Sequence, residues 1–439
     1  MRPSTSTVPP PALTQRQVTA AIAFSALGWA FDLFDLFILL YVAPVLAKAF
    51  FPAGRQMLSI AGIYAAFTAT LVMRPVGGWV FGRYADRRGR KRAMVVAATG
   101  VGVSTALMGT IPTVDTIGLL APTLFLALRL VQGVFMGGMV ASTHTLGTES
   151  ISPRRRGLAS GIISGGGSGV GKLLASLAFL VVTSLFPGPA FAVWGWRVMF
   201  FCGLLSSFLG LFVFTRLQES PLWEALAAQS HAPGAQPAPG GEARLAAFVP
   251  VIVLGVVLTM AGGGLSYLTS GYLPTFMKLV NHVRPQDLGR ILSLSALAVI
   301  ASSVLSGHLT DVVGRKPAML LYGVASLLAI PPLYLGLSRA ASLAEVGAYA
   351  VLLSAAGTFC YAPLLIVLNE RFPTAIRSSG TAVAWNVGFA LGGSMPVFVS
   401  LIAKASAGLA PALALATGVL AVAYLVAALL VPARRNRMT

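Results

Sequence analysis

The residues of this sequence that could do chemistry are ionisable side chains placed inside long apolar stretches. Asp32 and Asp35 lie near the middle of one such stretch, in Trp29-Ala-Phe-Asp-Leu-Phe-Asp-Leu-Phe37. An ionisable group at the centre of a bilayer costs at least ~2.5–3.5 kcal/mol on insertion scales, so each one needs a partner or a task. Their spacing puts both carboxylates on one face of a helix, where they resist ionising together. We expect at least one of them to carry a proton; the alternative is a permanent pair with a neighbouring arginine.

Two basic residues are candidate partners for these carboxylates. Arg129 lies near the middle of the fourth apolar stretch, where it could exchange partners when an aspartate takes up a proton, or else form a fixed ion pair. Lys172 lies midway along the fifth stretch, directly after Gly171. We expect it to bind a substrate carboxylate, with a salt bridge to Asp32 or Asp35 as the alternative. The expectation is one wet cavity that holds these four charges.

Other polar residues in the apolar stretches have weaker claims. Arg74 lies nearer the end of the second stretch, and we expect a structural role more than a substrate contact. His144 could relay protons, because imidazole changes its charge near neutral pH, although a lone histidine more often packs. Residues that combine apolar surface with hydrogen-bonding groups are plausible lining for a small-molecule site, namely Tyr267, Tyr272, Tyr361, Trp385 and Asn386. Of these, Tyr272 could instead gate the site or belong to an interfacial aromatic belt.

The composition places these residues in a membrane protein. The chain has 56% hydrophobic residues, 10% charged residues and a mean hydropathy of +0.83, whereas soluble domains carry about 25% charged residues. The sequence predicts an all-α, polytopic membrane protein with twelve transmembrane helices. The predicted spans are 18–47, 57–82, 92–111, 117–148, 157–186, 194–216, 247–278, 287–312, 317–338, 344–370, 377–403 and 408–432.

The net charge of +19 reflects topology. Lysine and arginine concentrate in the tails and in the loops that share their side of the membrane, which is the positive-inside pattern. We therefore expect both termini in the cytoplasm and no binding of nucleic acid. Cys202 and Cys360 fall within apolar spans, so neither a disulfide nor a metal site is expected.

A short phrase occurs twice, about half the chain apart. Gly82-x-x-x-Asp86-x-x-Gly89-Arg90-Lys91 recurs as Gly307-x-x-x-Asp311-x-x-Gly314-Arg315-Lys316. Such a repeat predicts two pseudo-symmetric six-helix bundles with the same turn at the same place. We expect its charged residues to act as gate elements at the helix ends, together with Glu149 and Glu370, which follow the fourth and tenth spans.

The domain organisation follows from this repeat and from a Pro/Gly/Ala-rich stretch at 232–241. The fifth and eleventh spans are both interrupted by glycines, and matching interruptions in two halves indicate a central binding site. The predicted units are a cytoplasmic tail at 1–17, an N-terminal bundle at 18–216, a linker at 217–246, a C-terminal bundle at 247–432 and a tail at 433–439.

The twelve spans, the doubled turn and Arg129-Leu-Val-Gln-Gly133 resemble the major facilitator superfamily. Further motifs resemble its metabolite:proton symporter branch: Phe50-Phe-Pro52, Met73-Arg-Pro-Val-Gly-Gly78, Trp194-Gly-Trp-Arg197, Tyr272-Leu-Pro274 and Phe372-Pro-Thr-x-x-Arg377. The resemblance implies two bundles that alternate access to a central cavity, usually driven by protons, and gives Arg129 a part in proton coupling. Members of the branch commonly have Gly-Gly-Glu in the fourth span, where this chain has Gly137-Gly-Met139.

These observations predict a secondary active transporter and no enzyme, because no nucleotide-binding loop, metal cluster or activated nucleophile is present in the sequence. We expect proton-coupled uptake of a small organic anion, such as a mono- or dicarboxylate. The alternatives are a proton-coupled exporter or metabolite exchanger, a symporter of zwitterionic osmolytes, and a transport-inactive sensor. The expected partners are the substrate, the proton and the lipid bilayer. No cofactor is expected, and the expected form is a functional monomer in a bacterial-type inner membrane.

Overall fold

The computed structural model describes residues 15–51, 54, 56–88, 90–149, 155–216, 247–373 and 376–432, and all of its regular elements in those ranges are helical. The N-terminal half contains α1 (Gln15–Phe50), α2 (Gln56–Arg88), α3 (Arg90–Thr110), α4 (Val114–Ile117), α5 (Leu120–Glu149), α6 (Arg156–Ser160), η2 (Gly161–Gly166), α7 (Gly167–Leu185), η3 (Phe191–Gly195) and α8 (Trp196–Arg216). The C-terminal half contains α11 (Val249–Ser266), η4 (Tyr267–Gly271), α12 (Leu273–Leu279), α13 (Pro285–Val312), α14 (Arg315–Leu337), α15 (Leu343–Phe359), α16 (Leu364–Asn369), α17 (Arg377–Gly393), α18 (Met395–Ala403), η6 (Ser406–Gly408) and α19 (Leu409–Leu430).

The twelve predicted spans are confirmed. Eleven helices in the described ranges are long and apolar enough to cross a membrane, and a shorter apolar helix, Phe191–Leu204, supplies the remaining span. Helices suit such stretches because they satisfy their backbone hydrogen bonds internally, and lipid offers no hydrogen-bond partners to the backbone. Residues 1–14 of the predicted tail at 1–17, the linker at 217–246 and the tail at 433–439 lie outside the described residues, and α1 already begins at Gln15.

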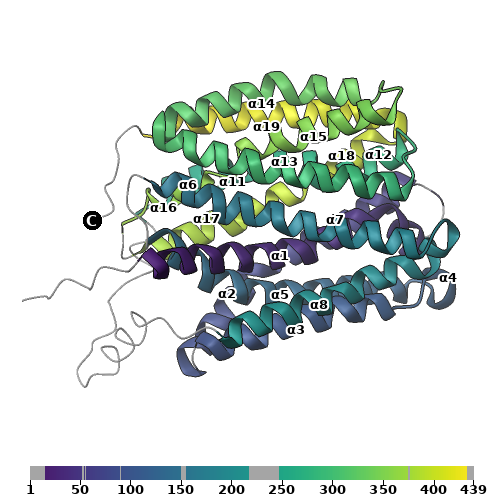
Figure 1. Cartoon of the computed structure of the whole chain (residues 1–439), viewed down its shortest axis with the longest axis horizontal. Coiled ribbons are helices and arrows are strands. Elements are labelled where there is room, and N and C mark those ends of the chain that lie inside the picture. The colour runs from purple at the N-terminus through teal and green to yellow at the C-terminus, as the bar shows by residue number, and fades with distance from the viewer. Residues whose placement is uncertain are drawn as a thin grey trace, which may run out of the picture.

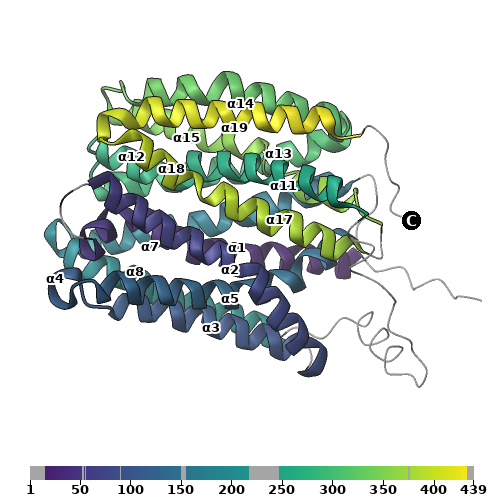
Figure 2. The same ribbon diagram turned by 180° about the vertical axis from the view of Figure 1, so that it is seen from behind.

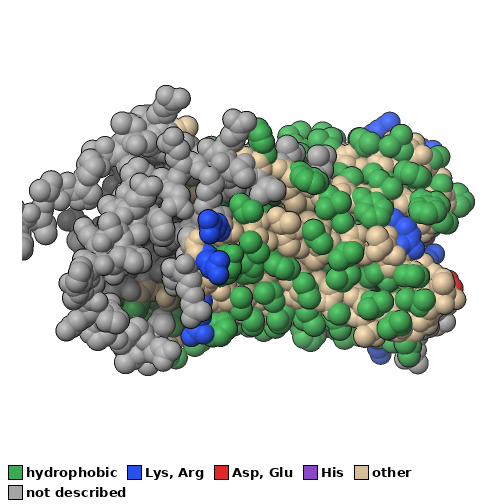
Figure 3. Space-filling view, turned by 90° about the horizontal axis from the view of Figure 1, so that it is seen from below, with side chains coloured by type: hydrophobic (Ala, Val, Ile, Leu, Met, Phe, Trp, Pro, Cys, Tyr) green, Lys and Arg blue, Asp and Glu red, His purple; other side chains and the backbone are tan. Residues whose placement is uncertain are grey.

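The helices form two bundles that lie side by side. Figure 1 shows the N-terminal half, coloured purple to teal, below the C-terminal half, coloured green to yellow, and Figure 2 shows the same division from behind. The bundles contact each other mainly where α7, η2 and α6 pack against α13 and where α2 packs against α17 and α18. Figure 3 shows hydrophobic side chains over the middle of the molecule, with lysine and arginine toward its two ends, as expected for a belt that faces lipid.

We name the two ends by the helix termini that lie there. The linker end holds the start of α1, the end of α8, the start of α11 and the end of α19; the opposite end holds the turns after α1, α3, α7 and α12. At the linker end, Gly314 separates α13 from α14 with a φ of +101°. Only glycine adopts that conformation without strain, which explains the last glycine of the repeated phrase.

The predicted interruptions of the fifth and eleventh spans are also observed. The fifth span contains a π-helical turn at Gly161–Gly166, and the eleventh is broken at Ser394 between α17 and α18. Another π-helical turn, η4, interrupts the seventh span. Turns of this kind cluster at functional positions, because they change the direction of side chains within a helix.

Candidate functional site

Asp32 and Arg74 form a buried ion pair on the side of the N-terminal bundle that faces the other half. The Arg74 Nη2 to Asp32 Oδ1 distance is 2.9 Å, and the two residues are 3% and 2% exposed. Asp32 Oδ2 and Arg74 Nε have no hydrogen-bond partner among the described residues. Tyr267 and Tyr361 of the C-terminal bundle lie close enough to interact electrostatically with both charges. The pair therefore sits at the boundary that alternating access would rearrange.

An aromatic cluster spans the same boundary. Trp29 Nε1 donates a hydrogen bond to the Tyr361 hydroxyl at 2.9 Å, and the Trp29 and Trp385 rings lie 5.7 Å apart. The Trp385 ring stacks on Phe389 at 4.6 Å. We use the name aromatic cluster for these residues and the rings that extend it, namely Trp29, Phe67, Tyr267, Tyr361, Trp385 and Phe389. It joins rings from both halves, and two of its members, Tyr267 and Tyr361, lie within electrostatic range of the ion pair.

Asp35 and Arg129 lie in a different environment, inside the N-terminal bundle. Arg129 is fully buried and donates from Nη1 to Gln132 Oε1 at 2.8 Å. Gln132 in turn donates to the Thr105 hydroxyl at 2.7 Å. Asp35 lies within electrostatic range of Arg129 and packs against Gly203 of α8, where an added methyl group would come within 2.9 Å of Asp35 Oδ1. All of these contacts stay within one bundle.

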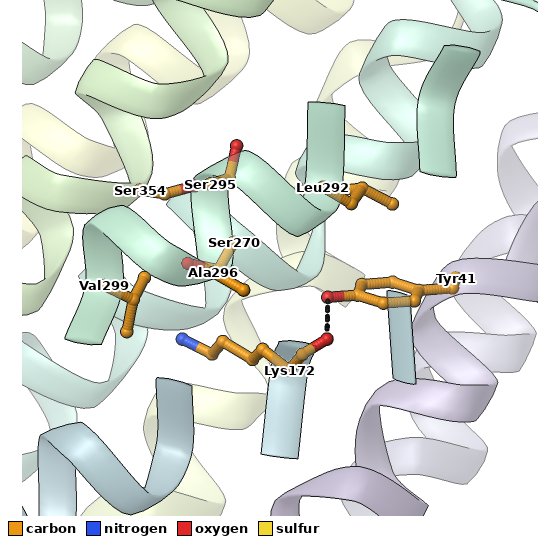
Figure 4. A pocket seen from close by; sticks show the side chains of 8 residues that line it. All are labelled: Tyr41, Lys172, Ser270, Leu292, Ser295, Ala296, Val299 and Ser354. Carbon is orange, nitrogen blue, oxygen red and sulfur yellow. Dashed lines mark hydrogen bonds between the residues drawn. The ribbon is translucent and has the colours of Figure 1, made fainter. Parts of the chain in front are cut away.

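Lys172 occupies a third environment, a small cavity between the bundles. The cavity has a free volume of about 10 Å³, roughly what one water molecule needs. Figure 4 shows the Lys172 side chain crossing it, with the ammonium on the same side as the Ser270 hydroxyl. The lining residues are Tyr41, Lys172, Ser270, Leu292, Ser295, Ala296, Val299 and Ser354.

The four charges are thus divided among three environments, and the expectation of one shared cavity is wrong in this structure. Asp32 has Arg74 as its partner, which agrees with the alternative of a pair with a neighbouring arginine, whereas Arg129 and Lys172 were the named candidates. Lys172 Nζ has no hydrogen-bond partner in the described ranges, so the alternative bridge to Asp32 or Asp35 is not formed. The reason is the direction of the two side chains. Asp32 and Asp35 lie three residues apart on the same broad face of α1, but their carboxylates point toward different neighbouring helices.

The linker end joins the bundles through charged groups. The Asp311 carboxylate, at the end of α13, accepts hydrogen bonds from the backbone N–H groups of Gly157 and Leu158 at 2.9 and 2.8 Å. Arg315 bridges Asp311 at 2.7 Å and Glu370 at 3.0 Å. An added methyl group on Gly307 would lie 2.5 Å from the Gly157 carbonyl oxygen, so this glycine permits the close approach of α13 to α6.

The opposite end joins the bundles through rings and hydroxyl groups. Tyr64 of α2 stacks on Tyr272 at 5.0 Å and hydrogen-bonds the Thr275 hydroxyl at 2.9 Å. Nearer the centre, the Thr68 hydroxyl donates to the Gly393 carbonyl at 3.0 Å. Tyr272 itself is fully buried, and its hydroxyl lies 2.9 Å from the Ser400 hydroxyl. Tyr272 therefore lies inside a contact between the bundles and outside any interfacial belt.

The remaining expected site residues are placed as follows. The half-exposed Asn386 donates to the Ala382 carbonyl of its own helix at 2.9 Å, while its neighbour Trp385 enters the aromatic cluster. Gly82 has no described atom within 4 Å of an added methyl group, unlike its counterpart Gly307. The side chains of four expected residues lie outside the described part of the chain, namely Asp86, Arg90, His144 and Glu149.

Sequence reasoning missed several residues that the structure brings to these sites. Trp29 could have been found, because it precedes Asp32 by three residues and shares its helix face. Ser270, Ser295, Tyr64 and Thr275 carry no local signal, since hydroxyl groups are common in membrane helices.

The chain as a whole matches a known protein family. A family model described as Major Facilitator Superfamily matches residues 19–395. The chain belongs to the major facilitator superfamily. It is therefore a transporter and not an enzyme, and it is a multi-pass membrane protein whose solved neighbours share its fold. The crystal structure of the D-xylose-proton symporter superposes with a TM-score of 0.75 at 18% identity, covering 96% of this chain and 100% of the other.

Curated relatives extend over nearly the same length. The chain is 31% identical over 393 residues to the inner membrane metabolite transport protein YhjE of Escherichia coli, covering 88% of each protein. It is 28% identical over 396 residues to the proline/betaine transporter of Escherichia coli, covering 89% of this chain and 78% of the relative. It is 29% identical over 398 residues to the citrate-proton symporter of Klebsiella pneumoniae, covering 89% and 88%. The predicted resemblance to the metabolite:proton symporter branch is confirmed.

Proposed function

We propose that the protein is a proton-coupled symporter that takes up a small organic anion, such as a mono- or dicarboxylate, by alternating access. The observation that carries this proposal is the buried Asp32–Arg74 pair at the boundary between the bundles. A buried charge pair is stable while both members are present, and removing one charge leaves the other uncompensated. A proton on Asp32 would create that situation.

The coupling follows from this charge balance. When Asp32 binds a proton, Arg74 loses its counter-charge and can accept a carboxylate from the substrate. Lys172 offers a second positive charge, in a cavity to which both bundles contribute; it lies over the Phe37 ring and has no hydrogen-bond partner in the described ranges. Arg74 and Lys172 together balance a dicarboxylate when Asp32 is protonated, and such a site can be buried when the bundles close. The same dianion beside an ionised Asp32 would leave one excess negative charge in the buried site. Proton and anion therefore cross together.

Orientation and direction belong to the same proposal. The positive-inside bias makes the linker end the cytoplasmic face, so that substrate enters at the opposite end. Similarity to a protein named as a citrate-proton symporter supports proton coupling and a carboxylate substrate. Similarity to a protein named as a proline/betaine transporter supports a zwitterionic substrate instead. The functional unit would be a single chain, since both bundles that line the site come from one polypeptide.

Uptake into proteoliposomes tests the proposal. We expect carboxylate accumulation when the outside is made acidic, and loss of accumulation when an ionophore collapses the gradient. Asp32→Asn should abolish the dependence on the gradient, while Asp115→Asn, at an exposed site near the opposite end, should leave it intact. Accumulation that is equal with and without the gradient would contradict proton coupling. Accumulation only when the gradient is reversed would instead favour an antiporter.

A further inference from the structure

The cavity around Lys172 contains three buried hydrogen-bond donors that nothing in the described ranges satisfies. Lys172 Nζ, Ser270 Oγ and Ser295 Oγ all lack a partner, and these residues are 2%, 5% and 3% exposed. A buried polar group without a partner is rare in native structures, because it loses its hydrogen bonds to water and gains none. Three such groups on one cavity indicate that a ligand or water completes them.

The chemistry of these groups selects an anion. An ammonium group has three donors and no acceptor, and each serine hydroxyl can donate once. None of the residues that line the cavity carries a carboxylate. The remaining polar lining groups are already used: Ser354 donates to the Thr269 carbonyl at 3.2 Å, and the Tyr41 hydroxyl donates to the Lys172 carbonyl at 3.3 Å. The unsatisfied set is therefore one positive charge and two hydroxyl donors.

The three donors come from both bundles. Lys172 lies on α7 of the N-terminal half, whereas Ser270 lies on the π-helical turn η4 and Ser295 on α13. Ser270 thus reaches the cavity from a π-helical turn that lies between the two α-helical parts of its span, α11 and α12. Because the cavity as it stands has room for about one water molecule, a carboxylate would enter when the bundles lie further apart. Held by all three groups, it would bridge the bundles.

We propose that Lys172, Ser270 and Ser295 form a three-point clamp for the carboxylate of the transported substrate, and that the clamp selects plain anions over zwitterions. This inference rests on the proposed function and names the substrate class of the same site. The selection arises because amino acids and betaines carry a cationic group one carbon away from the carboxylate. That group would lie near the Lys172 ammonium, and no acidic side chain lines the cavity to receive it.

Binding to the purified full-length protein tests the clamp, with acetate, pyruvate, succinate and citrate as carboxylate probes and glycine betaine as the zwitterionic probe. At least one carboxylate should raise the thermal midpoint, because a ligand that binds only the folded state stabilises it. For that carboxylate, Ser270→Ala and Ser295→Ala should each weaken Kd about tenfold, and Lys172→Gln about 100-fold, the range expected for hydrogen bonds to a charged group.

The matched control is Ser354→Ala, which removes a hydroxyl from the same cavity that is already hydrogen-bonded to Thr269. It should change Kd by less than about twofold. Equal effects of Ser270→Ala and Ser354→Ala would overturn the clamp, as would glycine betaine binding more tightly than every carboxylate. The thermal midpoint of each unliganded variant separates a folding defect from a binding defect.

The proposed function can fail separately. If a carboxylate accumulates with the proton gradient but Ser270→Ala behaves as Ser354→Ala does, the clamp is wrong and proton-coupled uptake stands. If the variants weaken carboxylate binding as expected but accumulation ignores the gradient, the clamp stands and proton coupling is wrong.

Discussion

The two ends of the molecule join the same pair of bundles by different chemistry. At the linker end, the Asp311 carboxylate binds backbone N–H groups at the start of α6 and pairs with Arg315. At the opposite end, Tyr64 stacks on Tyr272, and neutral hydroxyl groups complete the contact. Hydrogen bonds to charged groups contribute about 1.5–3 kcal/mol each, and neutral ones about 0.5–1.5 kcal/mol.

The difference indicates which kind of substitution should affect the contact at each end. The charged contact combines few strong bonds with a helix N-terminus, whose partial positive charge favours a carboxylate. The neutral contact depends on ring packing and on several weaker hydrogen bonds. Changes in charge should therefore act on the linker end, and changes in shape or hydroxyl content on the opposite end.

The largest expected effect comes from Gly307→Ala. Its new methyl group would press on the Gly157 carbonyl. The conformation in which the linker end is closed should therefore be destabilised by about 1–3 kcal/mol, the range for overpacking. The population closed at that end should fall roughly five- to 150-fold, which spin-label distances across the linker end would measure. Gly418→Ala is the control, since its methyl group would meet its nearest neighbour at 3.9 Å. An unchanged distance distribution for Gly307→Ala would mean that this contact does not limit closure.

Asp311→Asn should have the next largest effect. The amide keeps an acceptor for one N–H group but loses the charge that Arg315 and the start of α6 share, so we expect a loss of about 1.5–2 kcal/mol. The matched control is Asp287→Asn on the same helix, whose arginine partners Arg284 and Arg290 are exposed and whose contacts stay within one bundle. Uptake rates and linker-end distances that respond equally to the two variants would contradict the assignment.

Tyr64→Phe should have a smaller effect, confined to the opposite end. It keeps the stack on Tyr272 and removes the hydrogen bond to Thr275, so the contact at the opposite end should be destabilised by about 0.5–1.5 kcal/mol. A double-mutant cycle with Thr275→Val measures the coupling. Tyr334→Phe, which removes a buried hydrogen bond to the Leu268 carbonyl within one bundle, is the control and should leave the distances across the opposite end unchanged.

Ionic strength should have the smallest effect. It tests most directly whether the linker-end contact is charged and the contact at the opposite end is neutral. Raising the salt from 0.1 to 1 M shortens the Debye length from about 10 to 3 Å. The linker-end contact is partly buried, with Glu370 the most exposed member, so we expect a shift of less than about 1 kcal/mol. Spin-label distances should change at the linker end alone. A shift at the opposite end would show that the two contacts are not chemically distinct.

Much of the fold could be predicted, because its signals are local. The length of the apolar stretches, the glycine interruptions and the repeated phrase are each contained within one helix or one turn. Together they predict the twelve spans and the two halves that are observed. The site was predictable only as a set of residue types. The cost of burying a charge marks Asp32 and Lys172 as candidate functional residues wherever their partners lie.

The sequence by itself determined the membrane helices, the repeat and the depth of the buried charges, since these depend on composition along one helix. The tertiary structure alone decided that Asp32 meets Arg74 at the bundle boundary while Asp35 stays beside Arg129 inside one bundle. It also decided that Lys172 lines one small cavity together with three serines from the other half. The physical reason is that pairing depends on the rotation and crossing of helices that are distant in sequence, and packing of whole bundles sets both.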